Sequence, residues 1–111
     1  MEVKWMEKAV EDLKGMDREL ALFIRKETDK RLQEKPLTDD QVVPVSKNRY
    51  EAYRLCLEDS NSGLNHRVIF KYSDEDNTVI VVKVGRREEI YNTENSKDIS
   101  ERISDLSDEL S

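Results

Sequence analysis

The chain has 111 residues, a net charge of −6, and 40% charged against 36% hydrophobic residues, so it encodes one domain with a small core. The acidic balance excludes a general nucleic-acid coat protein, which would be basic throughout. The single cysteine, Cys56, excludes a disulfide framework and a metal site built on cysteine pairs. No apolar run approaches the ~18 residues of a membrane span. We therefore expect a cytoplasmic protein with no metal, no cofactor and no membrane partner.

The N-terminal third predicts a short strand followed by a pair of helices. Val3 and Trp5 share one parity within residues 1–5, and apolar residues then recur at helical spacing as far as Lys14. A second helix is expected to begin after Asp17, which can cap it, and to end before Pro36. Its expected buried stripe consists of Leu20, Phe23, Ile24 and Leu32. The two helices should form a hairpin with one apolar side.

The middle of the chain predicts three consecutive strands. Residues 49–57 form the first, residues 58–65 form a turn, and residues 66–91 contain two strands joined at 73–77. Residues 42–45 could add a short edge segment. Because short connections favour antiparallel neighbours, the expected fold class is α+β. Two N-terminal helices pack on a small twisted, mainly antiparallel sheet, and a C-terminal helix follows.

The two strands between His66 and Tyr91 separate by parity into an apolar set and a basic set. The apolar set is Val68, Phe70, Tyr72, Ile80, Val82 and Val84, and the basic set is Arg67, Lys71, Lys83 and Arg87. Strand side chains alternate between the two faces of a sheet. The pattern therefore predicts one core face and one basic face. The basic face is either a functional surface or a solvated face screened by nearby acids.

The last 18 residues are acidic and are predicted to form one helix. Residues 94–111 carry six acids against Lys97 and Arg102, which gives −4. Their apolar residues follow a narrow helical stripe: Ile99, Ile103, Leu106 and Leu110. A helix with so few apolar contacts must dock on another surface or is only marginally stable. We divide the chain into a domain over 1–93 and an acidic C-terminal helix over 94–111, which belongs to that domain or is a mobile tail.

The order of several motifs resembles a known family. After the helical hairpin come Y-R-L-C-L, H-R-V-I-F-K-Y, an acidic D-E-D turn, T-V-I-V-V-K-V-G-R-R and a closing I-Y. Together they resemble the RelE/ParE superfamily of toxins from toxin–antitoxin systems, over roughly residues 1–93. RelE-like members are ribosome-dependent endoribonucleases that cleave mRNA, whereas ParE-like members poison DNA gyrase. The arginine pair and the tyrosine are closer to the RelE-like branch.

The resemblance implies a toxin that inhibits translation by metal-independent cleavage of mRNA on the ribosome. Its partners would be a cognate antitoxin, the ribosome and mRNA. It assigns Arg67 as the transition-state clamp, Arg87 to the leaving group or scissile phosphate, Tyr91 to orienting or stacking on the substrate, and Arg54 to a basic position on the first long strand. Arginine suits these roles because its planar fork binds phosphate bidentately and keeps its charge.

Further assignments concern RNA contacts, the general base and the antitoxin. The expected RNA-binding residues are Lys71, Lys83 and Arg86. Where the family often carries a second basic residue proposed as the base, this chain has Cys56, so Cys56 and His66 are the candidate bases. The stripe from Ile99 to Leu110 is a candidate antitoxin contact. A toxin that binds DNA gyrase and an inactive homologue of the same fold remain as alternatives.

Overall fold

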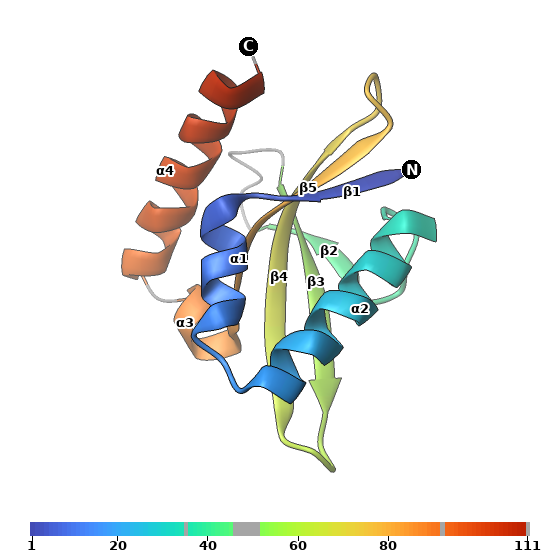
Figure 1. Ribbon diagram of the computed structural model, residues 1–111, viewed down its shortest axis with the longest axis vertical. Coiled ribbons are helices and arrows are strands. Elements are labelled where there is room, and N and C mark those ends of the chain that lie inside the picture. Colours follow the sequence, from blue (N-terminus) through green and yellow to red (C-terminus); the bar gives the residue numbers. More distant parts are fainter. Residues whose placement is uncertain (35, 46–51, 92, 111) are drawn as a thin grey trace.

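The described residues form a five-stranded sheet and four helices (Figure 1). The computed structural model describes residues 1–34, 36–45, 52–91 and 93–110. Its elements in chain order are β1 (Glu2–Trp5), α1 (Glu7–Lys14), α2 (Arg18–Glu34), β2 (Val42–Pro44), β3 (Ala52–Asp59), β4 (Leu64–Ser73), β5 (Thr78–Arg86), α3 (Arg87–Tyr91) and α4 (Thr93–Leu110). The predicted α+β class is confirmed.

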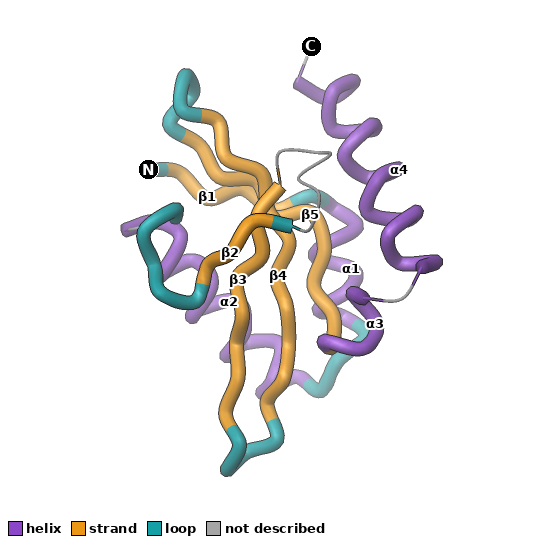
Figure 2. The backbone as a smooth tube through the Cα atoms, turned by 180° about the vertical axis from the view of Figure 1, so that it is seen from behind, coloured by secondary structure: helices purple, strands orange, loops and turns teal. Residues whose placement is uncertain are grey.

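The strand order of the sheet is β1-β5-β4-β3-β2. The pairs β2–β3, β3–β4 and β4–β5 are antiparallel, and β1 lies parallel to β5. The sheet is therefore mainly antiparallel, as predicted, and residues 42–44 do form an edge strand. Seen from behind, α1 and α2 lie beyond the sheet while α4 runs along the side of β5 (Figure 2).

The prediction of one apolar and one basic sheet face is wrong for β5. All of its residues from Thr78 to Gly85 are buried, so this strand is covered on both sides. The register shifts beside Ile69, because Lys83 pairs with Ile69 whereas Val81 pairs with Phe70. The extra residue of this bulge changes the alternation. Ile80 consequently lies opposite Lys71 rather than on the Phe70 side, where simple parity had placed it.

The predicted buried stripe of α2 is only partly correct. Ile24 and Leu32 are fully buried, and Thr28 lies between them. Phe23, however, is 49% exposed. The helix is tied to the first strand instead: the Trp5 indole Nε1 donates to Asp29 Oδ1 at 2.8 Å. Helix α2 therefore packs near β1, and the side of the helix that carries Phe23 is not covered by the described residues.

Helix α4 is fastened to the open edge of β5. Strand β1 covers β5 only as far as Val81, and polar side chains satisfy the edge beyond it. The Val84 amide donates to Asp12 Oδ2 at 3.0 Å, and Arg102 Nη1 donates to the Val82 carbonyl at 2.9 Å. Arg102 also donates to Asp12 at 2.7 Å and 3.1 Å. One guanidinium thus joins α4, α1 and β5.

The apolar stripe of α4 faces the body of the protein. Ile99, Ile103 and Leu106 are buried, whereas the side chain of Leu110 lies outside the described residues. Asp98 adds an ion pair with Lys83 on β5 and another with Arg102 at 3.2 Å. Burial raises the pKa of Asp98, but the hydrogen bond from Lys83 and the charge of Arg102 outweigh it and hold the pKa below its ordinary value. No described helix is long and apolar enough to cross a membrane.

Candidate functional site

Three arginines gather around the ring and hydroxyl of Tyr91. The Cζ atom of Arg54 lies 4.7 Å from the Tyr91 ring centroid, and that of Arg87 lies 5.3 Å from it. Arg67 Nε donates to the Tyr91 hydroxyl at 3.5 Å. All four residues predicted as catalytic therefore meet in one cluster. We call Arg54, Arg67, Arg87 and Tyr91 the arginine–tyrosine cluster.

The backbone explains why these residues meet. Strands β3 and β4 place Cys56 opposite Arg67, so Arg54 and Arg67 share one face of the sheet. Helix α3 follows β5 directly and returns Tyr91 to the same face. The side chains of α3 pack closely over Gly85, where a Cβ would lie 3.1 Å from Glu89 Oε2 and 3.4 Å from Ile90 Cδ1. The glycine before the arginine pair therefore lies directly against the helix that carries Tyr91.

Arg67 is buried and makes hydrogen bonds to several neighbours in the cluster and on its own strand. Its side chain is 4% exposed, and Nη1 donates to the His66 carbonyl at 3.1 Å and to Asn65 Oδ1 at 3.2 Å. Burial lowers the pKa of Arg67, but the hydrogen bonds to Tyr91 and Glu58 outweigh that effect and raise it. The guanidinium is therefore held in one orientation and remains charged, as a phosphate clamp requires.

Glu58 is the residue of this site that the sequence did not identify. Its carboxylate forms an ion pair with Arg67 Nη2 while its side chain remains 57% exposed. Glu58 lies two residues beyond Cys56 on β3, so strand parity alone assigns it to the arginine face. That signal was available, but the residue falls at the start of the predicted turn, where parity is a weak guide. An exposed carboxylate thus lies beside Arg67.

The two predicted bases are placed differently. Cys56 lies opposite Arg67 on the cluster face and is partly exposed. His66 faces the other side of the sheet, as its parity indicated, and is 5% exposed. Burial lowers the pKa of His66, and the charge of Arg86 lowers it further. His66 is therefore a buried neutral imidazole that points away from the cluster.

The three predicted RNA-binding residues do not join the cluster. Lys71 shares the face of Arg67 but lies four residues further along β4, which is roughly 13 Å. Lys83 is 7% exposed and forms its ion pair with Asp98 of α4. Arg86 pairs across the sheet with His66, on the opposite face, and lies 3.9 Å from Glu88. Among the described residues no group of three or more His, Cys, Asp or Glu side chains could hold a metal ion.

The comparisons with known proteins identify a toxin fold. The family model described as the ParE toxin of type II toxin–antitoxin systems, parDE, matches residues 3–91. A mutant of the E. coli toxin RelE in the free state is 19% identical with a TM-score of 0.67, over 92% of this chain and 96% of that one. The RelBE2 toxin–antitoxin complex of Mycobacterium tuberculosis is 17% identical with a TM-score of 0.64, over 78% of this chain and 96% of that one.

The intact E. coli RelBE toxin–antitoxin complex is 18% identical with a TM-score of 0.58, over 77% of this chain and 94% of that one. A search among curated protein sequences found no match. At these identities the solved structures establish a shared fold, and the family model establishes the family. The resemblance to the RelE/ParE superfamily is confirmed.

Proposed function

The chain belongs to the family of ParE toxins of type II toxin–antitoxin systems, and on this premise we propose that it inhibits translation by cleaving mRNA on the ribosome without a metal ion. The arginine–tyrosine cluster carries this proposal. Three permanent cations converge on one aromatic ring, which is 45% exposed. Such a site can bind a phosphate and stack on a base.

Arg67 and Arg87 would bind the scissile phosphate. Arg67 is fixed on three sides by Asn65, the His66 carbonyl and the Tyr91 hydroxyl, and Nη2 is paired with Glu58, whose side chain is exposed. A phosphate oxygen would replace the Glu58 carboxylate at Nη2. Arg54 adds a buried Nε that has no hydrogen-bond partner among the described residues. A phosphate oxygen would satisfy that donor. Positive charge fixed in this way stabilises the pentacoordinate phosphorane as it forms.

Glu58 is the proposed general base. Its carboxylate would accept the proton of the ribose 2′-hydroxyl, and the 2′-oxygen would then attack the adjacent phosphorus. The bond from phosphorus to the 5′-oxygen breaks, and a proton must reach that oxygen. The Tyr91 hydroxyl can supply it, because Arg67 donates to the Tyr91 oxygen and leaves the phenolic hydrogen available. The products are a 2′,3′-cyclic phosphate and a 5′-hydroxyl.

The test is to induce the chain in cells and map the ends of translated and untranslated copies of one transcript. We expect cleavage only in the translated copy, and loss of cleavage in Arg67→Ala and Arg87→Ala. Lys71→Ala is the matched control, since Lys71 lies on the same face of β4 as Arg67 but outside the cluster. Cleavage that persists in Arg67→Ala, or is lost equally in Lys71→Ala, would refute the assigned site.

The second candidate function is binding to DNA gyrase. The family model that matches the chain is that of ParE toxins, and ParE-like toxins poison gyrase. Growth arrest with intact mRNA and an induced DNA-damage response would identify this activity. Absence of arrest at any level of expression would instead identify an inactive homologue. The same induced cultures distinguish all three outcomes.

We also propose that the cognate antitoxin binds at α4. Two of the similar structures are complexes of toxin and antitoxin. The stripe of Ile99, Ile103 and Leu106 is buried against the body, so an antitoxin segment can reach it only if α4 moves. A complex in which hydrogen exchange at α4 is slowed or unchanged, rather than accelerated, would exclude displacement of this helix.

A further inference from the structure

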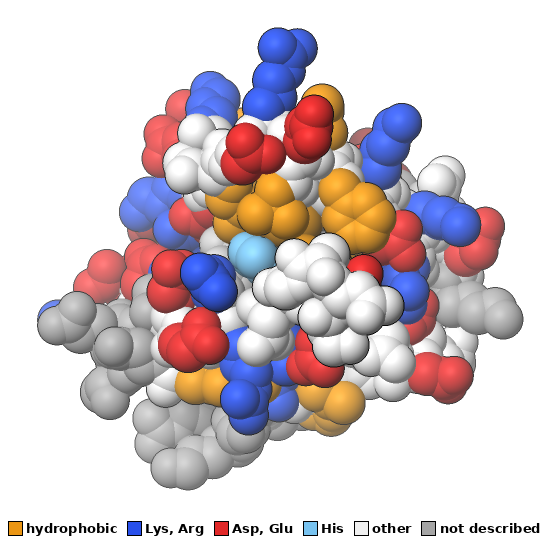
Figure 3. Space-filling view, turned by 90° about the horizontal axis from the view of Figure 1, so that it is seen from below, with side chains coloured by type: hydrophobic (Ala, Val, Ile, Leu, Met, Phe, Trp, Pro, Cys, Tyr) orange, Lys and Arg blue, Asp and Glu red, His pale blue; other side chains and the backbone are white. Residues whose placement is uncertain are grey.

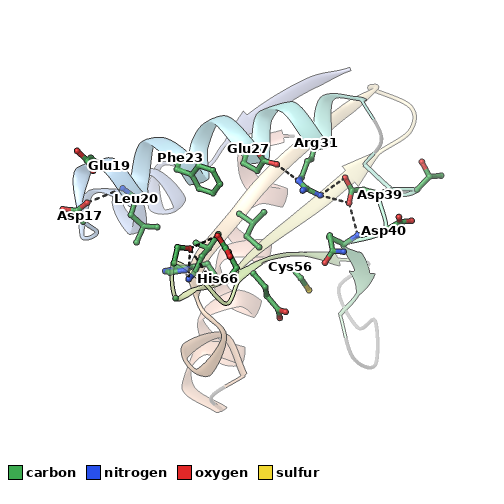
Figure 4. Close-up of a pocket in the computed structure, with 18 residues that line it drawn as sticks. Asp17, Glu19, Leu20, Phe23, Glu27, Arg31, Asp39, Asp40, Cys56 and His66 are labelled. Atoms are coloured by element: carbon green, nitrogen blue, oxygen red, sulfur yellow. Dashed lines mark hydrogen bonds and ion pairs between the residues drawn. The ribbon is translucent and has the colours of Figure 1, made fainter.

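A deep groove runs between α2, the loop that follows it and the hairpin of β3 and β4 (Figure 4). We call it the α2 groove. It has a volume of about 1150 Å³, which exceeds the roughly 300–1,000 Å³ of a typical small-molecule pocket. Its position on the far side of Arg67, across β3 and β4, separates most of it from the arginine–tyrosine cluster. The groove is thus a second surface, which meets the proposed ribonuclease site at Glu58.

The floor of the α2 groove is apolar. Leu20 and Phe23 point from α2 toward the strands, and Leu57 and Leu64 line the opposite side. From below, apolar side chains form a patch that is bordered above and at its sides by charged side chains and below by the histidine and uncharged atoms (Figure 3). Phe23 is 49% exposed, although the sequence pattern predicts that it is buried. An exposed aromatic side chain in a groove is typical of a site that another molecule covers.

The rim of the α2 groove is strongly acidic. Its carboxylates are Asp17, Glu19 and Glu27 at α2, Asp39 and Asp40 in the following loop, and Glu58 and Asp59 at the end of β3. Among the described residues the one lysine or arginine that lines it is Arg31, which is bonded to Glu27 at 2.7 Å and to Asp39 at 3.2 Å. Seven carboxylates against one guanidinium leave a formal −6, the same as the net charge of the entire chain. The occupant should therefore be basic.

His66 provides an independent sign of a missing ligand. Its side chain lines the groove and is 5% exposed, and its Nδ1 has no hydrogen-bond partner among the described residues. A buried ring nitrogen without a partner costs free energy unless a ligand or water completes it. A polar group of the occupant would complete it here.

We propose that the α2 groove binds an amphipathic helix of a partner protein, with an apolar stripe against Phe23 and Leu20 and with lysines or arginines on both sides of that stripe. An α-helix with side chains is about 10–12 Å wide and rises 1.5 Å per residue, so the groove volume holds roughly two to three turns. The acidic rim pairs with the flanking cations. The apolar floor selects the spacing of the stripe.

The test uses the full chain and a synthetic helical peptide of about 14 residues, with leucines at i, i+3, i+4 and i+7 and lysines beside them. We expect binding by fluorescence anisotropy that weakens at least tenfold between low and high salt. A peptide with glutamates in place of the lysines, and a scrambled peptide of the original composition, should not bind.

Matched variants locate the site. Phe23→Asp should lower the affinity at least tenfold, whereas Leu22→Asp, on the same helix and 56% exposed but outside the α2 groove, should change it less than twofold. The pair Glu19→Gln and Asp40→Asn should weaken binding. The pair Glu7→Gln and Glu11→Gln changes the net charge equally on α1 and should not.

Three outcomes would overturn the proposal. Equal losses for Phe23→Asp and Leu22→Asp, or for the two charge pairs, would show that the peptide binds acidic surface without a defined site. Equal binding of the scrambled peptide would show the same. A dimer in sedimentation velocity that disappears in Phe23→Asp would assign the groove to a second copy of the chain. Far-ultraviolet circular dichroism of each variant controls for folding.

Discussion

Replacing Arg102 by methionine should release α4 from the body of the protein. Arg102 has a 9% exposed side chain and joins Asp12, Asp98 and the Val82 carbonyl. Methionine keeps most of the apolar volume of the side chain but removes all of these bonds. Asp12, whose side chain is 18% exposed, then loses its cation, and of its donors among the described residues it keeps the Val84 amide. Breaking a buried ion pair from one side costs about 3–5 kcal/mol.

That loss is large against the ~5–15 kcal/mol that stabilises a typical domain. We expect urea unfolding to show a free energy of unfolding lower by about 3 kcal/mol, and hydrogen exchange to show faster exchange in α4 than in β4. The second ion pair between α1 and α4 is the control. Lys8 and Asp105 lie 3.8 Å apart with side chains 50% and 57% exposed, and Lys8→Met should cost less than ~1 kcal/mol.

The double variant Asp12→Asn with Arg102→Met separates the two parts of the effect. If the cost arises from the stranded Asp12 carboxylate, the double variant should recover part of the stability that Arg102→Met loses. A loss below ~1 kcal/mol in Arg102→Met, or equal losses for Arg102→Met and Lys8→Met, would refute the inference that this buried guanidinium fastens α4.

The other predictions concern the cluster and the buried ionisable groups. Glu58→Gln should reduce mRNA cleavage by roughly 10²–10⁴-fold if Glu58 is the base; increased cleavage, measured on the same transcript, would instead identify it as a competitor of phosphate for Arg67. Tyr91→Phe keeps the ring beside Arg54 and Arg87 but removes the hydroxyl, so it should retain RNA binding and lose cleavage, whereas Tyr91→Ala should lose both; equal cleavage by wild type and Tyr91→Phe contradicts a role for the hydroxyl. The free energy of unfolding, measured by urea denaturation, should fall in two pH windows. The pKa of His66 is lowered from 6.5 in the folded state, so the unfolded state takes up its proton first and stability declines from about pH 6.5 down to the folded pKa. The pKa of Asp98 is lowered from 3.8, so its contribution is present above that value and is lost as the pH falls through the folded pKa. His66→Gln should flatten only the upper window and Asp98→Asn only the lower one.

The sequence predicted those features that depend on local pattern. Periodicity located both N-terminal helices and the long strands, and Pro36 lies just after the end of α2 at Glu34. The members of the arginine–tyrosine cluster were predicted from the order of motifs that resembles a known family. Their spacing along the chain does not by itself predict how close they lie in space. Their meeting around the Tyr91 ring follows from the β3–β4 register and from the return of α3 at Gly85.

The features that the sequence did not predict depend on tertiary packing. Parity failed in β5 because one bulge residue reverses the alternation. The apolar period of α2 marked Phe23 as buried, but the helix leans toward β1 and leaves that side open. In the sequence, Arg102 was one of two basic residues in the acidic segment 94–111. Its role depends on an uncovered strand edge, and only the end of β1 at Trp5 creates that edge.

The distribution of charge reconciles the acidic chain with the proposed RNA substrate. The α2 groove alone carries a formal −6, which equals the net charge of the whole chain, so the rest of the molecule sums to zero. Exposed charges are screened beyond about 8 Å at physiological salt. Most of the groove carboxylates lie on the far side of the sheet from Arg54, Arg87 and Tyr91, so the potential at the proposed phosphate site depends mainly on its own cations. Glu58 is the exception, because it lines the groove and also pairs with Arg67. A basic partner that draws the Glu58 carboxylate into the groove would also take the proposed base away from Arg67, so the two proposed functions are linked through this one side chain.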